Sequence, residues 1–292
     1  MIYVNEFIES KINENLQDAT IKEYRYYLAQ FESFLLNHLD KTRIAKLTFS
    51  HIKRPDIQAY IDSVRDSGKS QATAKKHLAY VKEFVYYLEG LGLIDSYCVY
   101  KIKIKKDKGV KKTKKHMTTE QGWNFFNSIT DDYDKCMVGL ALFHGFRRTE
   151  ISEVLVDNVD LEDWTIVFTR KGQIEETIFI QPQIKELMAK QVEYCKERAH
   201  IYLFQSPHKE QPLSTVSVWK AFKKWLEFAG LGEYDFSVHD GRRFFALSLY
   251  EDGYTLEEIQ VALSHASVET SRKYVNLTKE KVMKSIGEKE AR

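Results

Sequence analysis

The second half of the chain carries scattered cationic and hydrogen-bonding side chains that precede one late tyrosine. Two arginines can bind the non-bridging oxygens of a phosphodiester, because a guanidinium is planar, always charged and donates paired N–H groups. A lysine whose pKa is lowered by nearby cations and burial can protonate a leaving oxygen, and a histidine can donate to a phosphate or accept the tyrosine proton. Such a set suits metal-free attack of a tyrosine on a phosphate. The candidate catalytic residues are Arg147, Lys171, His239, Arg242, His265 and Tyr274.

Neighbouring arginines make two of these positions ambiguous. Arg147 is followed by Arg148, and Arg242 is followed by Arg243. These segments resemble two motifs of the tyrosine recombinase family: its G-x-R-x-x-E-[LI] motif selects Arg147, with Glu150 one helical turn further on as a supporting residue, and its H-x-x-R motif selects Arg242. Taken singly, an arginine is more often a surface or ion-pair residue, so the hypothesis depends on all the elements occurring together.

The order and spacing of these elements resembles the tyrosine recombinase family, also called the phage integrase family. Three departures from its usual pattern remove no catalytic group: Arg243 where histidine is common, Ser264 where glycine is common, and a hairpin return strand without its frequent proline. The resemblance covers residues 116–292 by its motifs and extends to 1–104 through the helical N-terminal domain of the family. Its motifs are Gly145-Phe-Arg-Arg-Thr-Glu-Ile151, Lys171-Gly172, His239-Asp-Gly-Arg242 and Leu263-Ser-His265, with Tyr274 nine residues later.

The resemblance implies a mainly α fold with a small β-sheet in the catalytic domain. It implies a C-shaped, two-domain DNA clamp with a helical core-DNA-binding domain at 1–104, a basic linker at 105–115 and an α+β catalytic domain at 116–292. Tyr274 would be the nucleophile and form a 3′-phosphotyrosyl link. The expected partners are double-stranded DNA recombination sites and three further copies of the chain in a homo-tetramer. No metal, small-molecule cofactor or membrane is expected.

Two alternatives stay open at the level of the sequence. A type IB topoisomerase shares this chemistry but relaxes a single duplex. A catalytically silent DNA-binding regulator would keep the fold and lack a catalytic group, yet Arg147, Arg242 and Tyr274 are all present. The sequence also leaves open whether a recombinase of this kind serves integration, excision or resolution of a mobile element or replicon.

The resemblance implies a cytoplasmic protein that associates with the nucleoid when it acts, and composition agrees with a soluble protein of a reducing compartment. The chain has 292 residues, which suggests two domains, and its 43% hydrophobic and 29% charged residues exclude an intrinsically disordered protein. Its longest uncharged apolar stretch, 136–146, is too short to span a bilayer, which needs about 20 residues. Three cysteines without a C-x-x-C pair give no sign of a disulfide framework or a zinc knuckle.

Charge is concentrated in one short segment. Residues 101–115 hold nine lysines and one aspartate, whereas residues 1–100 hold 13 basic and 13 acidic side chains. Such a run is first of all a solvated linker between domains, and it can also lie along a polyanion, because lysines bind phosphates regardless of base sequence. The candidate DNA-binding residues are Lys105, Lys106, Lys108, Lys111 and Lys112 of this run, with Lys75 and Lys76 of the preceding domain.

Hydrophobic periodicity and capping residues predict the elements that position these groups. The spacing of apolar residues between Ile21 and Leu35 favours one helix face, and Ser70 is suited to cap a later helix. Thr255 and Glu258 form a capping-box pattern in a helical C-terminal region. Further helices are predicted near 55–66, 118–129, 131–145, 182–198 and 214–229, and a β-hairpin over 164–169 and 177–180 with a polar connection at 170–176.

Overall fold

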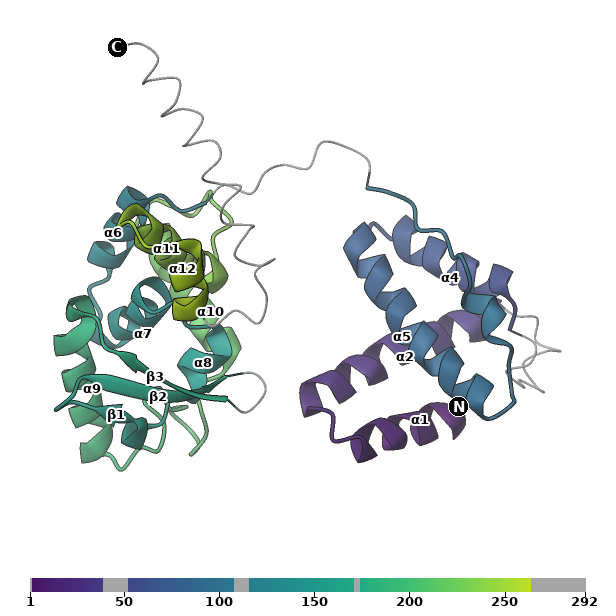
Figure 1. Ribbon diagram of the computed structural model, residues 1–292, viewed down its shortest axis with the longest axis horizontal. Helices are drawn as coiled ribbons and strands as arrows, with labels where there is room; N and C mark the ends of the chain where they lie inside the picture. The colour runs from purple at the N-terminus through teal and green to yellow at the C-terminus, as the bar shows by residue number, and fades with distance from the viewer. Residues whose placement is uncertain (1, 39–51, 108–115, 171–173, 264–292) are drawn as a thin grey trace, which may run out of the picture. The chain divides into compact units, whose positions relative to one another are not determined.

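A computed structural model describes residues 2–38, 52–107, 116–170 and 174–263 of the chain (Figure 1). The chain divides into two compact units, Met1–Lys112 and Thr113–Arg292. Helices dominate the described residues of both units, and a small three-stranded sheet lies in the second. The predicted fold class is therefore confirmed. Within the described ranges, no helix combines the length and the apolar character needed to cross a membrane.

The first unit is a helical bundle around one apolar core. Ile21, Leu28, Phe31 and Leu35 are buried on one face of α2, as their spacing predicts, and they pack with the buried face of α5. Each apolar residue removed from water in this way contributes roughly 1.5–3 kcal/mol. The elements are α1 (Ile2–Asn13), α2 (Asp18–His38), α4 (Arg54–Asp66), α5 (Gln71–Gly90) and η2 (Ser96–Val99).

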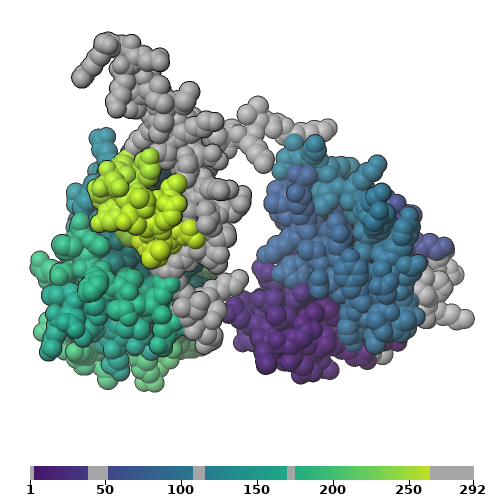
Figure 2. All heavy atoms as spheres, in the orientation of Figure 1, coloured from purple at the N-terminus to yellow at the C-terminus, as the bar shows by residue number. Residues whose placement is uncertain are grey.

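The second unit is built around the buried helix α7. Every side chain from Cys136 to Phe143 in this helix is buried, because α6, α8, α9 and α11 all pack against it. In Figure 2, α12 lies at the surface of this unit in yellow-green. The helical elements are α6 (Thr119–Ser128), α7 (Asp132–Phe143), α8 (Arg148–Glu153), η3 (Val156–Asn158), η4 (Pro182–Ile184), α9 (Lys185–Glu197), α10 (Thr215–Phe228), α11 (Val238–Glu251) and α12 (Leu256–Leu263).

The sheet has the strand order β1-β2-β3 with antiparallel pairing throughout (Figure 1). The predicted hairpin is confirmed as β2 (Thr165–Arg170) and β3 (Ile174–Phe179), but β3 begins three residues earlier than the expected Thr177. The charged side chains of Glu175 and Glu176 misled the prediction, although in β3 Glu175 is exposed and Glu176 remains half-exposed on the opposite face. The two-residue strand β1 (Val159–Asp160) was not predicted, because so short a run has no readable periodicity.

Candidate active site

A tight loop between α7 and α8 delivers the first candidate arginine. Gly145 has a φ of +64°, a conformation that favours glycine. A Cβ at this position would lie 2.9 Å from Cδ1 of Phe245 and 3.0 Å from Cδ2 of Leu263. The absence of a side chain at Gly145 therefore lets the loop pass against α11 and the end of α12 before the chain reaches Arg147.

Glu150 holds Arg147 through both its backbone and its side chain. The Arg147 backbone N–H donates to Glu150 Oε2 at 2.7 Å. The guanidinium Nη1 of Arg147 pairs with the other carboxylate oxygen, Glu150 Oε1. The Glu150 side chain is 5% exposed, whereas the Arg147 side chain is 39% exposed. The carboxylate thus fixes the guanidinium from the protein side and leaves part of it accessible to an anion.

Arg242 lies on α11 in the interior of the unit and is 1% exposed. Its Nη1 donates to the carbonyl oxygen of Gly145, and its Nη2 donates to that of Leu263. Nη1 also lies 3.9 Å from Glu150 Oε2. One buried guanidinium therefore connects the loop that carries Arg147 to the last residue of α12, immediately before Ser264 and His265.

His239 lies in the first turn of α11 and shares this electrostatic environment. Partial desolvation lowers the pKa of His239, and the positive charges of Arg243, Arg242 and Arg147 lower it further, with Asp240 acting in the opposite direction. The pKa therefore favours a neutral imidazole at neutral pH, able to accept or share a proton. Asp240 also caps the helix, accepting from the backbone N–H of Ser237 at 2.8 Å, and pairs with Arg243 at 3.1 Å.

Comparisons with known proteins agree with this geometry. The model of the phage integrase family matches residues 114–281, more than half of the chain. The chain belongs to the phage integrase family. The model of the phage integrase N-terminal SAM-like domain matches residues 4–90. The predicted family and the predicted enzyme class, a tyrosine-type site-specific recombinase, are therefore confirmed.

Individual relatives of this recombinase have low sequence identity to it, but the matches cover more than nine tenths of this chain. The tyrosine recombinase XerD of Oceanobacillus iheyensis is 24% identical over 277 residues, which cover 92% of this chain and 91% of that protein. The XerH recombinase in a pre-cleavage complex with its difH substrate is similar with a TM-score of 0.71 and 25% identity, over 91% of this chain and 79% of that one. A lambda integrase tetramer bound to a Holliday junction is similar with a TM-score of 0.72 and 16% identity, and the match covers 93% of this chain and 76% of that chain.

The structure brings together four of the predicted site residues of the recombinase: Arg147, Glu150, His239 and Arg242. The sequence did not predict that the backbone carbonyl oxygens of Gly145, in the first motif, and Leu263, in the last, accept hydrogen bonds from Arg242. No sequence signal could have shown these contacts, because every residue carries the same backbone carbonyl group. The remaining candidates, Lys171, His265 and Tyr274, lie outside the described residues, so their roles stay predictions.

The lysines proposed to bind DNA fall into three groups. Lys76 pairs with Glu23 at 2.6 Å and lies over the ring of Tyr27, and Lys105 pairs with Asp66 at 3.0 Å. These two amines are engaged within the first unit. Lys75 and Lys106 are exposed. Lys108, Lys111 and Lys112 lie outside the described residues. Binding of DNA by any of these side chains stays a prediction.

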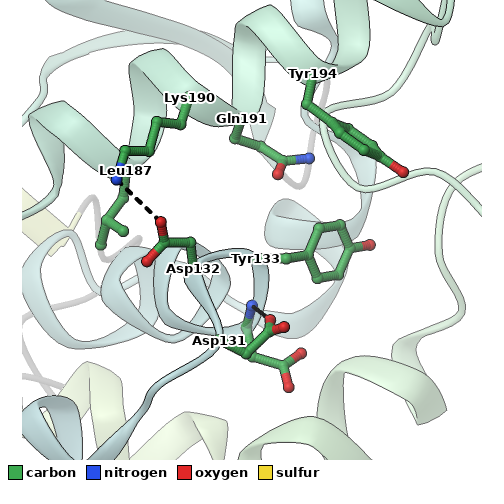
Figure 3. A pocket seen from close by; sticks show the side chains of 8 residues that line it. Asp131, Asp132, Tyr133, Leu187, Lys190, Gln191 and Tyr194 are labelled. Carbon is green, nitrogen blue, oxygen red and sulfur yellow. Dashed lines mark hydrogen bonds and ion pairs between the residues drawn. The ribbon is translucent and has the colours of Figure 1, made fainter.

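A separate hollow of about 470 Å³ lies beside the start of α7, lined by Asp131, Asp132, Tyr133 and Gln191 among others (Figure 3). A salt bridge of 3.1 Å between Lys190 and Asp132 crosses it (Figure 3). Arg147 follows the other end of α7, and a 12-residue helix is about 18 Å long. This hollow is therefore distinct from the arginine cluster. Within the described part of the chain, no group of three or more His, Cys, Asp or Glu side chains could hold a metal ion.

Proposed function

We propose that this recombinase cleaves and rejoins DNA at specific sites through a 3′-phosphotyrosyl intermediate on Tyr274, and so exchanges strands between two sites. The observation that carries the proposal is the convergence of Arg147, Glu150, Arg242 and His239 in the second unit. A phosphodiester is an anion, and in-line attack increases the charge on its non-bridging oxygens. The cluster supplies fixed positive charge and a neutral imidazole for such a group.

The different exposures of the two arginines give each a part in this scheme. Arg147 can reach a bound phosphate from its exposed side while Glu150 holds it in place. Arg242 keeps the Gly145 loop and the end of α12 in register and adds its charge to the same environment. Because these groups are oriented before the substrate binds, they need little reorganisation during the reaction.

The covalent step balances without a cofactor. The phenolic oxygen of Tyr274 forms a bond to phosphorus, and the bond from phosphorus to the 5′-oxygen breaks. A general acid, proposed to be Lys171, protonates that oxygen, while a histidine, His239 or His265, accepts the tyrosine proton. A 5′-hydroxyl from a partner duplex then attacks phosphorus, so that the new bond to the 5′-oxygen forms and the bond to the Tyr274 oxygen breaks. In this reverse step Lys171 takes the hydroxyl proton and the histidine returns a proton to the tyrosine oxygen. The energy of the broken bond is kept in the covalent link, so ATP is not required.

Assembly of the recombinase is proposed by analogy. The two units would hold opposite sides of a duplex as a clamp, and four copies would act on two sites. A lambda integrase of the same fold forms a tetramer on a Holliday junction, and this supports a homo-tetramer here. The exchange could serve integration, excision or resolution of a mobile element or replicon.

The test replaces Tyr274 with phenylalanine and uses a duplex selected from a random library by the wild-type chain. A nicked version of this site traps the covalent intermediate, which is measured as a protein–DNA band on a denaturing gel. The wild-type chain should form the band in the presence of EDTA as well as in its absence, and Tyr274→Phe should abolish it under both conditions. Tyr254→Phe, which removes the same hydroxyl from an exposed tyrosine, is the matched control and should leave it intact.

Three results would count against the proposal. A Tyr274→Phe band of wild-type intensity would assign the nucleophile elsewhere. Cleavage that needs added magnesium or zinc would overturn the metal-free step. Relaxation of a supercoiled plasmid by single copies, without recombinant products from two sites, would favour a topoisomerase.

A further inference from the structure

The lysine-rich run begins with a segment that is docked on the first unit. Residues 101–107, called the strap here, form no helix or strand and lie outside the two matched family models, which cover 4–90 and 114–281. Ile102 and Ile104 are half-buried against the apolar core of the first unit, while the lysines between and beside them are exposed. The alternation places one face of the strap on the protein and the other in solvent.

Side chains of α4 bind the backbone of the strap. Gln58 donates from Nε2 to the carbonyl oxygen of Lys103 at 2.8 Å and accepts from the Lys103 N–H at 2.8 Å, as a neighbouring β-strand would. Arg54 donates to the carbonyl oxygen of Lys101 at 3.0 Å. Lys105 then reaches back to Asp66 at 3.0 Å. The backbone of the strap is therefore tied to α4 at two residues, and the side chain of Lys105 ties it at a third.

Asp107 closes the strap at the start of α5. It is the single acidic residue among nine lysines in 101–115. Its Oδ1 accepts from the backbone N–H of Gln71, the first residue of α5, at 2.9 Å, and lies 2.8 Å from Nη2 of Arg65. The N–H groups of a first helical turn have no partner within their own helix, and the helix dipole favours a negative charge there. No other side chain in 101–115 carries a negative charge that could make this contact.

We propose that Asp107 is a positioning residue for recombination: by fixing the strap, it sets the point from which the connection to the catalytic unit departs. This proposal rests on the proposed function for its recombination readout. Eight residues, 108–115, follow the strap. Release of residues 101–107 would lengthen the connection by up to ~24 Å. The effective concentration of a tethered module falls with roughly the −3/2 power of tether length. Lengthening the connection from eight to fifteen residues would therefore lower the effective concentration of the catalytic unit at the target phosphate by about threefold.

The first arm of the test measures docking in the full-length chain without DNA. Asp107→Ala should raise hydrogen exchange at the Lys103 amide, and tryptic cleavage after Lys103, by roughly five- to tenfold, because a charge-assisted contact at the end of the strap is lost. Glu83→Ala, which removes one carboxylate from an exposed position on α5, is the charge-matched control and should change neither. Asp107→Glu keeps the charge and should restore most of the protection. Unchanged exchange in Asp107→Ala would show that Asp107 does not hold the strap.

The second arm measures recombination of the selected site. Asp107→Ala should lower the rate by up to about threefold relative to Glu83→Ala, with the midpoint of thermal unfolding nearly unchanged. Insertion of the seven residues Gly-Ser-Gly-Ser-Gly-Ser-Gly after Asp107 keeps the strap docked but lengthens the connection as much as release of the strap would, and it should lower the rate similarly. If exchange rises in Asp107→Ala while recombination stays at the control rate, or if the insertion has no effect, the positioning role is wrong. If the wild-type chain does not recombine DNA, the proposed function fails while the docking arm still reports on the strap.

Discussion

Glu150 and Arg242 meet inside the second unit, where Glu150 Oε2 lies 3.9 Å from Arg242 Nη1. The other carboxylate oxygen of Glu150 pairs with Arg147. One buried carboxylate therefore serves two arginines, one on the surface of the site and one in its interior. A shared counter-ion fixes the separation of the two positive charges, and this separation must match the oxygens of a phosphate for both to act on it.

The first prediction is that Glu150→Gln lowers the rate of DNA cleavage by on the order of 10-fold or more, because Arg147 loses its charged partner and its preset orientation. Affinity for the selected site should change by less than about twofold, since most DNA affinity comes from other phosphate contacts. Glu153→Gln, at an exposed position of the same helix, is the matched control. Single-turnover cleavage and filter binding measure the two quantities. A cleavage rate equal to that of Glu153→Gln would contradict the positioning role.

The second prediction separates the two arginines by stability. Arg147→Ala and Arg242→Ala should each lower cleavage by on the order of 10²-fold, the loss typical of an oriented donor at developing charge. Arg242→Ala should also lower the free energy of unfolding by about 3 kcal/mol, because it leaves the buried carbonyls of Gly145 and Leu263 without their donor and removes one of the two cations beside the buried Glu150 carboxylate. Arg147→Ala should cost about 1 kcal/mol or less, since its side chain is 39% exposed.

Urea denaturation of both variants measures this difference, with the exposed Arg148→Ala as control. Equal stabilities for the Arg147 and Arg242 variants would show that Arg242 does not connect the Gly145 loop to α12. Wild-type cleavage by either variant would remove that arginine from the site.

Much of this architecture could be predicted from local signals. The apolar stripe of α2, the Ser70 cap and the Thr255–Glu258 capping box all depend on residues close in sequence, and each is found as expected. The motif pattern likewise selected Arg147 over Arg148 and Arg242 over Arg243, and the selected pair shares Glu150.

The missed features depend on contacts between distant residues. Arg242 binds carbonyl oxygens 97 positions before it and 21 after it, and a carbonyl group carries no sequence signal. The prediction divided the strap at residue 104, with 105–107 in a basic linker because lysines dominate the run, whereas Ile102, Ile104 and Asp107 decide its contacts. Charge density alone therefore failed to show where the folded unit ends.

The third prediction concerns which lysines contact DNA. Lys106→Gln should reduce the slope of log affinity against log salt by up to about 0.9, the value for one phosphate contact. Lys105→Gln should reduce it less, because this amine is already paired with Asp66 and lies 3.7 Å from Asp62. The same contrast is expected between the exposed Lys75 and Lys76, which is paired with Glu23. Titrations at several salt concentrations measure the slopes. A larger effect for Lys105 and Lys76 would show that their ion pairs open on DNA.

The last prediction concerns a buried histidine at the end of α7. His144 accepts a hydrogen bond at Nε2 from the backbone N–H of Gln181 at 3.0 Å, so it joins α7 to the residue before η4. Burial lowers the pKa of His144 to about 4. In the unfolded chain its pKa is near 6.5, so the unfolded state binds a proton first as the pH falls. Stability should therefore be lost between about pH 6.5 and pH 4, by about 3 kcal/mol from this group.

The measurement is urea denaturation of the full-length chain at pH 7 and pH 4.5. His144→Gln cannot take up this proton, so its free energy of unfolding should fall less between the two pH values than that of the wild type. A constant offset in stability from altered packing does not affect this comparison, because the readout is the difference between the two pH values. His208→Gln, at an exposed position, is the control and should keep the wild-type pH dependence. An unchanged pH dependence in His144→Gln would assign the acid sensitivity of the fold to other groups.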